Sequence, residues 1–89
     1  MFRVRWARQA LNELAQAWAG ADAATRKEIT SASHAIDQQL SADPFHTGES
    51  RSPGRRIAFF PPLVVTFRVE AVRQTVSVSL IRLFGKRRS

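Results

Sequence analysis

Cysteine is absent from this chain of 89 residues. Without thiols the protein can form neither disulfide bonds nor a thiolate metal site, and its composition suits a reducing compartment. Long hydrophobic runs are absent as well, since no stretch approaches the roughly 18 apolar residues of a membrane span. No apolar signal-peptide core follows the arginines of the N-terminal segment. The sequence therefore predicts a soluble, cytoplasmic protein that does not enter a membrane.

Motifs for metals and cofactors are also lacking. The chain has two histidines and four glycines, with no cluster of metal-ligating side chains and no glycine motif that would cradle a phosphate. Its serines, histidines and aspartates are not spaced as a catalytic set. We therefore expect no metal site and no cofactor.

Acidic residues are scarce in one half of the chain. Residues 1–50 carry five basic and six acidic side chains, whereas residues 51–89 carry nine basic side chains and one acidic side chain. A cationic surface of this kind favours binding of a polyanion, because binding releases the counterions that surround the polyanion. The alternative is that the charge only keeps the protein in solution.

The hydrophobic residues of the chain are enough to form one small core. Hydrophobic residues make up 44% of the chain and include six Phe and two Trp. A second core has no room in a chain of this length. Residues 1–89 are therefore expected to form a single domain.

The N-terminal half of the sequence predicts a strand and two helices. Residues 2–6 alternate apolar and polar side chains, as a short strand does. Apolar residues then recur at helical spacing from Ala7 until Gly20. Residues 25–28 fit a capping box that begins a second helix, which ends before Pro44. We expect these helices to form an antiparallel hairpin.

The C-terminal half predicts a long loop and three strands. Residues 41–54 are rich in turn-forming residues. Three runs of β-branched and aromatic residues follow at 56–60, 63–70 and 75–83, separated by short turns. The predicted fold class is α+β: an N-terminal strand, a two-helix antiparallel hairpin and a three-stranded antiparallel meander. The first strand is expected at the edge or centre of a four-stranded antiparallel sheet with the helices on one side.

The strand patterns indicate which side chains meet the helices. In the last run Val76, Val78 and Leu80 share a face, but Ile81 and Leu83 break the alternation. This break predicts either a bulge or an end tucked under the helices, and it leaves the orientation of Arg82 open. The remaining residues expected in contact with the helices are the apolar face of the middle run and both tryptophans: Leu63, Val65, Phe67, Val69, Trp6 and Trp18.

Segments along nearly the whole chain resemble the RelE/ParE superfamily of bacterial toxins, and so does the predicted order of elements. The segments are Ile36-Asp37, Leu40, Asp43-Pro44, Gly48-Glu49-Ser50-Arg51, Gly54-Arg55-Arg56-Ile57, Leu63-Val64-Val65, Phe67-Arg68-Val69 and Gly85-Lys86-Arg87.

The resemblance implies a cognate antitoxin protein as partner, with an acidic or amphipathic segment that covers the basic face or the helical hairpin. It also implies one of two activities: RelE-like members cut mRNA in the ribosomal A site, and ParE-like members inhibit DNA gyrase. Cleavage needs cations near the scissile phosphate and a general acid. By position in the family pattern, Arg56 and Arg87 would be the catalytic cations. His46 would be the acid or base, unless it is an ordinary surface residue.

The sequence departs from the RelE-like pattern in three respects. Ala58 and Val64 stand where the pattern has a lysine and an arginine, and the chain contains no tyrosine. Ribosome-dependent cleavage of mRNA is the leading prediction, and these departures keep the gyrase inhibitor as its alternative. A third reading is a degenerate member that binds nucleic acid or an antitoxin without toxicity.

Basic residues near the sheet are the candidate nucleic-acid contacts. Arg51, Arg55, Arg56 and Arg68 are expected to flank or line the face away from the helices. Small hydroxyl residues such as Thr66, Ser77 and Ser79 lie beside them, and Phe60 is a candidate for stacking on a base. An ordinary solvated face is the alternative. The C-terminal residues 85–89 would contact nucleic acid or be a frayed end. The predicted nucleic-acid-binding residues are Arg51, Arg55, Arg68, Arg82, Lys86 and Arg88.

Overall fold

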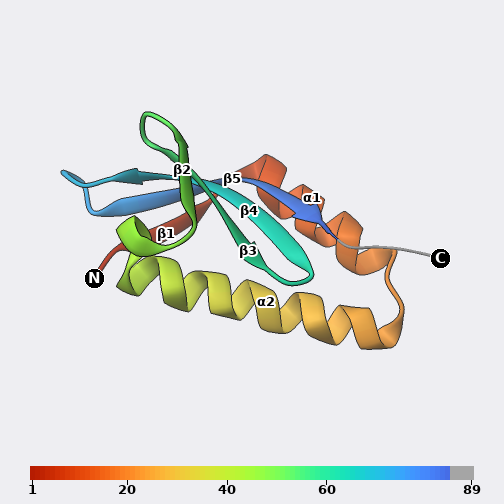
Figure 1. Ribbon diagram of the computed structural model, residues 1–89. Coiled ribbons are helices and arrows are strands. Elements are labelled where there is room, and N and C mark those ends of the chain that lie inside the picture. Colours follow the sequence, from red (N-terminus) through yellow and green to blue (C-terminus); the bar gives the residue numbers. More distant parts are fainter. Residues whose placement is uncertain (85–89) are drawn as a thin grey trace.

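The computed structural model describes residues 1–84 as a sheet with two helices (Figure 1). Along the chain the elements are β1 (Arg3–Trp6), α1 (Arg8–Ala19), α2 (Ala23–Ala42), a short 3-10 helix η1 (Pro44–His46), β2 (Glu49–Ser52), β3 (Arg55–Phe60), β4 (Leu63–Glu70) and β5 (Thr75–Leu83). The predicted strand, helical hairpin and meander are therefore confirmed. No helix among residues 1–84 has the length and apolar character needed to span a membrane.

The sheet has five strands in the order β1-β5-β4-β3-β2, and it is mixed. β1 lies at one edge and pairs with β5 in parallel, so the prediction of a fully antiparallel sheet is wrong. A strand of four residues has the same alternating pattern in either direction, so its sequence does not indicate which way it runs.

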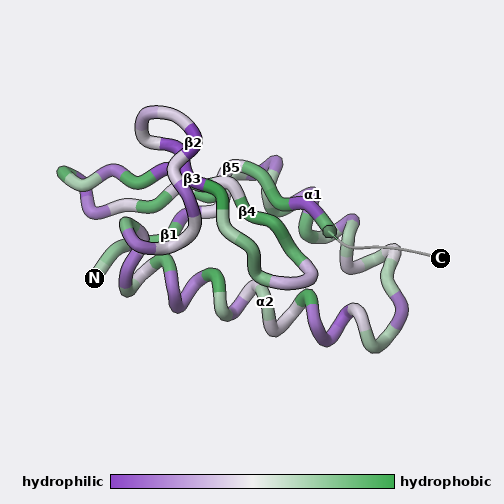
Figure 2. The backbone as a smooth tube through the Cα atoms, viewed as in Figure 1, coloured by the Kyte–Doolittle hydropathy of each residue, from purple (hydrophilic) through white to green (hydrophobic). Residues whose placement is uncertain are grey.

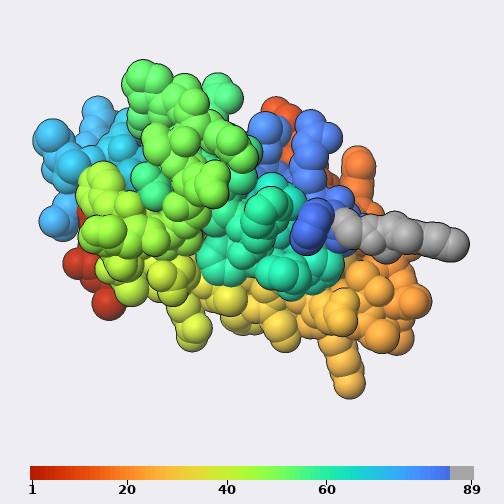
Figure 3. All heavy atoms as spheres, viewed as in Figure 1, coloured from red at the N-terminus to blue at the C-terminus, as the bar shows by residue number. Residues whose placement is uncertain are grey.

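One strand of the sheet, β2, is not predicted by the sequence. It lies in the segment expected to be only a loop. Its residues are polar, and they form a strand because a turn at Pro53-Gly54 brings them back against β3. Gly54 has a φ angle of 77°, which glycine adopts without strain. The β2–β3 hairpin stands out from the rest of the surface (Figure 3). The expected loop also contributes the end of α2 and the η1 turn.

Capping residues define the end of α1 and the start of α2. Asp22 is the N-cap of α2, and its carboxylate accepts a hydrogen bond of 2.8 Å from the backbone N–H of Thr25. The helix therefore starts at Ala23, two residues before the predicted capping box, because aspartate is among the best N-cap residues. α1 ends at Ala19 with Gly20 as its C-cap, as predicted. Hydrophobic and hydrophilic residues alternate along α2, turn by turn (Figure 2).

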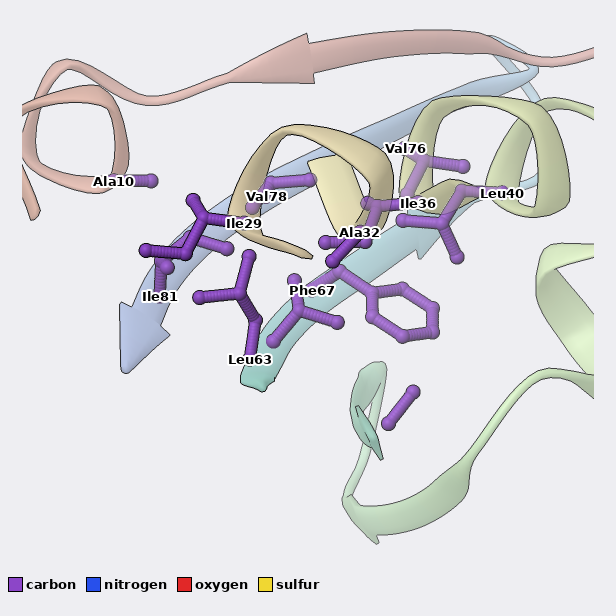
Figure 4. Close-up of a cluster of buried hydrophobic side chains, with 12 residues drawn as sticks. Ala10, Ile29, Ala32, Ile36, Leu40, Leu63, Phe67, Val76, Val78 and Ile81 are labelled. Atoms are coloured by element: carbon purple, nitrogen blue, oxygen red, sulfur yellow. The ribbon is translucent and has the colours of Figure 1, made fainter. Parts of the chain in front are cut away.

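The core lies between α2 and one face of the sheet. Side chains at helical spacing on α2, from Ile29 to Leu40, point toward the inner face of β4 and β5 (Figure 4). Phe67 is the largest of the fully buried side chains. The predicted inner face of β4 is confirmed, and the buried cluster consists of Ala10, Ile29, Ala32, Ile36, Leu40, Ala58, Leu63, Val65, Phe67, Val76, Val78 and Ile81.

β5 contains the predicted bulge. Thr66 pairs with Leu80 and Phe67 pairs with Val78, so Ser79 is the extra residue. The bulge reverses the alternation: Ile81 is buried, and Leu80 lies on the face away from α2, contrary to the prediction that grouped it with the inward residues. Arg82, whose orientation the sequence left open, lies opposite Val64 on that same outer face.

α1 covers the edge of β5 that β1 leaves free. β1 ends at Trp6, and the backbone N–H of Ala7 makes the last hydrogen bond to Val78. Beyond this point the Glu13 side chain of α1 replaces β1 as the hydrogen-bond partner of β5. Its Oε1 accepts a hydrogen bond of 2.7 Å from the backbone N–H of Ile81. A helix side chain thus satisfies a strand edge that would otherwise be open.

The two tryptophans have different environments. Trp6 packs against the core, as predicted, and its Nε1 donates a hydrogen bond to Asp37. Trp18 is 44% exposed, so its predicted place in the core is wrong. Its ring lies under the guanidinium group of Arg26, 4.3 Å from the ring centroid, and Arg26 also donates to the Trp18 carbonyl. This contact holds Trp18 at the surface of the helical hairpin.

Candidate nucleic-acid interface

The face of the sheet opposite α2, which we call the open face, carries a row of arginines. Arg55 on β3 lies directly opposite Arg68 on β4, Arg68 lies opposite Ser77 on β5, and Ser77 lies beside Arg5 on β1. Neighbouring strands are about 4.8 Å apart, so the row crosses four strands over about 14 Å. We call Arg5, Arg55 and Arg68 the arginine row.

The arginine row has no acidic partner at ion-pair distance among residues 1–84. The ion pairs in this part of the chain join His46 to Asp43 and Arg51 to Glu49. Like charges placed directly opposite each other on a sheet repel, so the pairing of Arg55 with Arg68 is unfavourable in the free protein. An anion bound between them would remove this repulsion.

A hollow of about 320 Å³ lies at the Arg55 and Arg68 end of the row. The bulge at Ser79 forms one side of it, and Gln9 at the start of α1 reaches it from the edge of the sheet. Guanidinium, hydroxyl and amide groups are the donors that bind phosphate oxygens. The lining residues are Gln9, Arg55, Thr66, Arg68, Ser77, Ser79 and Leu80.

Two phenylalanines occupy the other end of the open face. Phe59 lies opposite Val64, which in turn lies opposite Arg82. The ring of Phe59 stacks with that of Phe84, with centroids 5.1 Å apart and planes 28° apart. The residue proposed for stacking on a base, Phe60, pairs with buried Leu63 and belongs to the inner side of the sheet, so that placement is wrong.

Arg56, the predicted catalytic cation, lies on the side of the sheet opposite the arginine row. It pairs with Phe67, whose side chain points into the core. Its Nε donates to the carbonyl of Thr47 at 2.9 Å, and its Nη2 donates to the carbonyl of Gly48 at 2.9 Å. The expectation that Arg56 lines or flanks the open face is wrong, because successive residues of a strand face opposite sides.

The other predicted residues of the described part of the chain lie on η1, on β2 and on the open face. His46 lies in η1 with 83% of its side chain exposed, and its Nδ1 lies 2.8 Å from Asp43 Oδ1. Arg51 lies on β2 with its Nη2 3.9 Å from Glu49. Arg55, Arg68 and Arg82 all face the open side. Arg87, Lys86 and Arg88 lie outside the described residues.

Comparison with solved structures identifies the fold. The RelBE2 toxin–antitoxin complex from Mycobacterium tuberculosis includes a chain that superposes with a TM-score of 0.71 at 15% identity, covering 92% of this chain and 90% of that one. A chain of the ParDE system from P. aeruginosa gives 0.64 at 19% identity, covering 96% and 98%. The isolated E. coli RelE toxin gives 0.63 at 13% identity, covering 100% and 88%. The chain has the RelE/ParE fold.

This likeness is one of structure rather than of sequence. No protein-family model matches the chain, and no curated protein matches it. The RelE/ParE fold places the C-terminal meander so that one side of the sheet packs on α2 and the other remains open. The fold predicted from the resemblance is therefore confirmed.

Sequence reasoning missed three contributors to the open face of this RelE/ParE fold. Arg5 was missed because its place depends on the parallel pairing of β1 with β5, and Gln9 because it depends on how α1 approaches the bulge. Phe59 was missed because Phe60 beside it is also aromatic. The alternation in 2–6 was the available signal for Arg5: the apolar residues must face the core, which sends Arg3 and Arg5 to the other side.

Proposed function

We propose that this chain is the toxin of a toxin–antitoxin pair and that its open face binds nucleic acid at the translating ribosome. The arginine row carries the proposal: three guanidinium groups cross one face of the sheet without an acidic partner among residues 1–84. The RelE and ParE likeness supports the toxin role, since several of the similar structures are toxin–antitoxin complexes.

A cognate antitoxin is the proposed regulator. The helical hairpin offers an apolar surface for it, formed by a groove in which exposed Leu11 and Trp18 lie beside Leu14 and Ile29. An amphipathic antitoxin segment would bury Leu11 and Trp18, and acidic residues in the same segment would neutralise the basic face.

The proposed activity is cleavage of mRNA in the ribosome. Arg55 and Arg68 are the cations that a scissile phosphate would meet on the open face, and they would stabilise the charge that develops on its oxygens. Arg87, in the C-terminal segment, remains a proposed further cation. The contacts of Arg56 with two backbone carbonyls favour a role in stability instead. His46 remains the proposed acid or base.

Inhibition of DNA gyrase is the second candidate. The two histidines lie on α2 and η1 rather than on a strand, so His46 would have to reach the open face from outside the sheet. Ala58 is buried on the inner side of β3, and Val64 lies opposite Phe59 at the end of the open face away from the arginine row. This arrangement favours binding over proton transfer.

Primer extension on an mRNA under translation by purified ribosomes tests the two candidates. The samples are the wild-type protein, Arg68→Gln, and Lys27→Gln as a control in which a cation on α2 is neutralised. Cuts that require ribosomes and weaken only in Arg68→Gln support the nuclease. If mRNA stays intact while the same wild-type preparation blocks supercoiling by purified gyrase, the nuclease proposal fails and the gyrase proposal takes its place.

A further inference from the structure

Ser52 continues the arginine row onto the edge strand β2. The bulge in β2 leaves Ser52 opposite Arg55, and Arg55 lies opposite Arg68. Residues that lie directly opposite each other on neighbouring strands share a face of the sheet. The hydroxyl-bearing side chain of Ser52 is therefore on the open face, at the end of the row that has two arginines side by side.

The turn between β2 and β3 brings both arginines close to Ser52. Ser52 and Arg55 are the first and last residues of a four-residue turn, so their Cα atoms lie within about 7 Å of each other. Arg68 reaches the same turn from β4, because a Cβ atom placed on Gly54 would lie 3.2 Å from Arg68 Nη1. The turn that begins at Ser52 thus lies beside the guanidinium group of Arg68 and ends at Arg55.

The acidic residue of β2 does not neutralise these two arginines. Glu49 lies opposite Ile57, and its Oε1 is 3.9 Å from Nη2 of Arg51 on the same strand. Arg55 and Arg68 have no acidic partner at ion-pair distance among residues 1–84. An anion attached to the Ser52 side chain would therefore be held by cations of its own chain.

Ser52 is accessible to a modifying enzyme. It is partly exposed, and its hairpin stands out from the surface (Figure 3). β2 has four residues and pairs on one side only, so opening it requires little free energy. Ser52-Pro53 is also the one position in the chain where a serine or threonine precedes proline, a step that proline-directed protein kinases select.

We propose that Ser52 is a phosphorylation site and that its phosphate binds Arg55 and Arg68, which closes this end of the open face. A protein kinase would transfer the γ-phosphoryl group of ATP. A bond forms between Ser52 Oγ and the γ-phosphorus, the bond from that phosphorus to the departing oxygen of ADP breaks, and the hydroxyl proton passes to a base of the kinase. The phosphate carries close to two negative charges and three acceptor oxygens, which suit two guanidinium groups.

The loss of activity on phosphorylation rests on the proposed function, whereas the contacts of the phosphate do not. Phosphorus NMR of the full chain with phosphoserine incorporated at position 52 tests these contacts. The second pKa of the phosphate should lie below that of a phosphoserine peptide, because nearby cations favour the dianion. Arg68→Gln should raise this pKa, and Arg82→Gln should not, since Arg82 lies opposite Val64 at the other end of the face.

Binding of a labelled short oligouridylate, followed by fluorescence anisotropy, tests the closure. Phosphate on Ser52 should weaken binding about ten-fold or more at 0.1 M salt, because two cations are neutralised. Phosphate on Ser50 is the matched control. It adds the same charge to the same strand, but Ser50 lies opposite Arg56 on the other side of the sheet, so binding should weaken much less.

Three results would overturn the proposal. The first is a phosphate pKa equal to that of the peptide, and the second is equal weakening of binding by the phosphates on Ser50 and Ser52, which would assign the effect to net charge. The third is absence of phosphate from Ser52, by mass spectrometry, in the protein recovered from both growing and starved cells that produce it naturally.

Growth arrest on induction is measured separately with the unmodified protein. If this protein neither arrests growth nor binds oligouridylate, the proposed function fails, and the phosphate pKa still decides whether Arg55 and Arg68 hold the modified serine. A protein that arrests growth but gives any of the three overturning results rejects only the switch at Ser52.

Discussion

At the scale of single residues, two neighbouring arginines on β3 have different roles because they face opposite sides of the sheet. Arg55 belongs to the arginine row, whereas Arg56 donates hydrogen bonds to the carbonyls of Thr47 and Gly48. Gly48 has a φ angle of 71°, and a Cβ atom there would lie 2.1 Å from the carbonyl oxygen of Ile57. Arg56 and Gly48 together fix the path by which the chain passes from η1 into β2.

Replacement of Arg56 by alanine should therefore reduce stability. Hydrogen bonds from a charged donor to two carbonyls are expected to contribute about 2 kcal/mol to the free energy of unfolding. Urea denaturation measures the loss, with Arg51→Ala as the control, because Arg51 is an exposed arginine whose ion pair contributes little. A folded Arg56→Ala protein of unchanged stability that no longer cleaves mRNA would restore Arg56 as a catalytic candidate.

The sequence could not decide between these two arginines. On β3 the set Arg55, Ile57, Phe59 and the set Arg56, Ala58, Phe60 each contain a cation, an aliphatic residue and a phenylalanine, so alternation alone does not indicate which set is buried. A shift of one residue in register exchanges the two faces. The register with β4 decides, since Arg56 pairs with Phe67 and Arg55 pairs with Arg68.

At the scale of elements, the parts with strong periodicity were predictable. β4 and β5 have the predicted bounds, and α1 ends where Gly20 indicated. The position of each strand within the sheet was harder to predict from the sequence. The neighbour of β1 is β5, more than 70 residues away, and a local pattern contains no information about so distant a partner. The arginine row depends on this pairing, which is why Arg5 was not predicted as part of the site.

The N-cap of α2 gives a prediction that depends on pH. The hydrogen bond from the backbone N–H of Thr25 lowers the pKa of Asp22 below its ordinary value. A pKa that is lower in the folded state stabilises the fold above the pKa of the unfolded chain, and this contribution disappears as the pH falls through the folded pKa. Asp22→Ala should therefore lower the Tm at neutral pH and have little effect in strong acid.

The Tm of the wild type, Asp22→Ala and Asp22→Asn, measured from strong acid to neutral pH, tests this prediction. Asparagine can also cap a helix but does not titrate, so Asp22→Asn should keep most of the neutral-pH stability and lack the acid-dependent change. A constant difference in Tm between the wild type and Asp22→Ala at all pH values would contradict the role assigned to the ionised carboxylate.

At the scale of the whole molecule, the arginine row is expected to favour nucleic-acid binding and to lower the stability of the free protein. Arg68→Thr removes the repulsion between Arg55 and Arg68 and supplies a residue that favours strands, so unfolding should become harder by roughly 0.5 kcal/mol at low salt. Binding of oligouridylate should weaken in the same variant. Arg82→Thr is the control for stability, because Arg82 lies opposite Val64 rather than another arginine.

The measurements are urea denaturation at low and high salt beside anisotropy titrations. The stability gain of Arg68→Thr should shrink at high salt, because ions screen the repulsion. Equal gains at both salt concentrations would attribute the effect to strand propensity rather than to charge.

The parallel pairing of β1 with β5 also has a consequence for synthesis of the chain. β1 leaves the ribosome long before its partner β5, so Arg5 reaches the side of Ser77 and Arg68 only after β5 has emerged and docked. A nascent chain that ends before Thr75 lacks both the neighbour of β1 and the edge that α1 covers. Contacts between distant segments form late in folding. The arginine row is therefore completed only after β5 has been synthesised, whereas its members Arg55 and Arg68 can pair as soon as β3 and β4 have emerged.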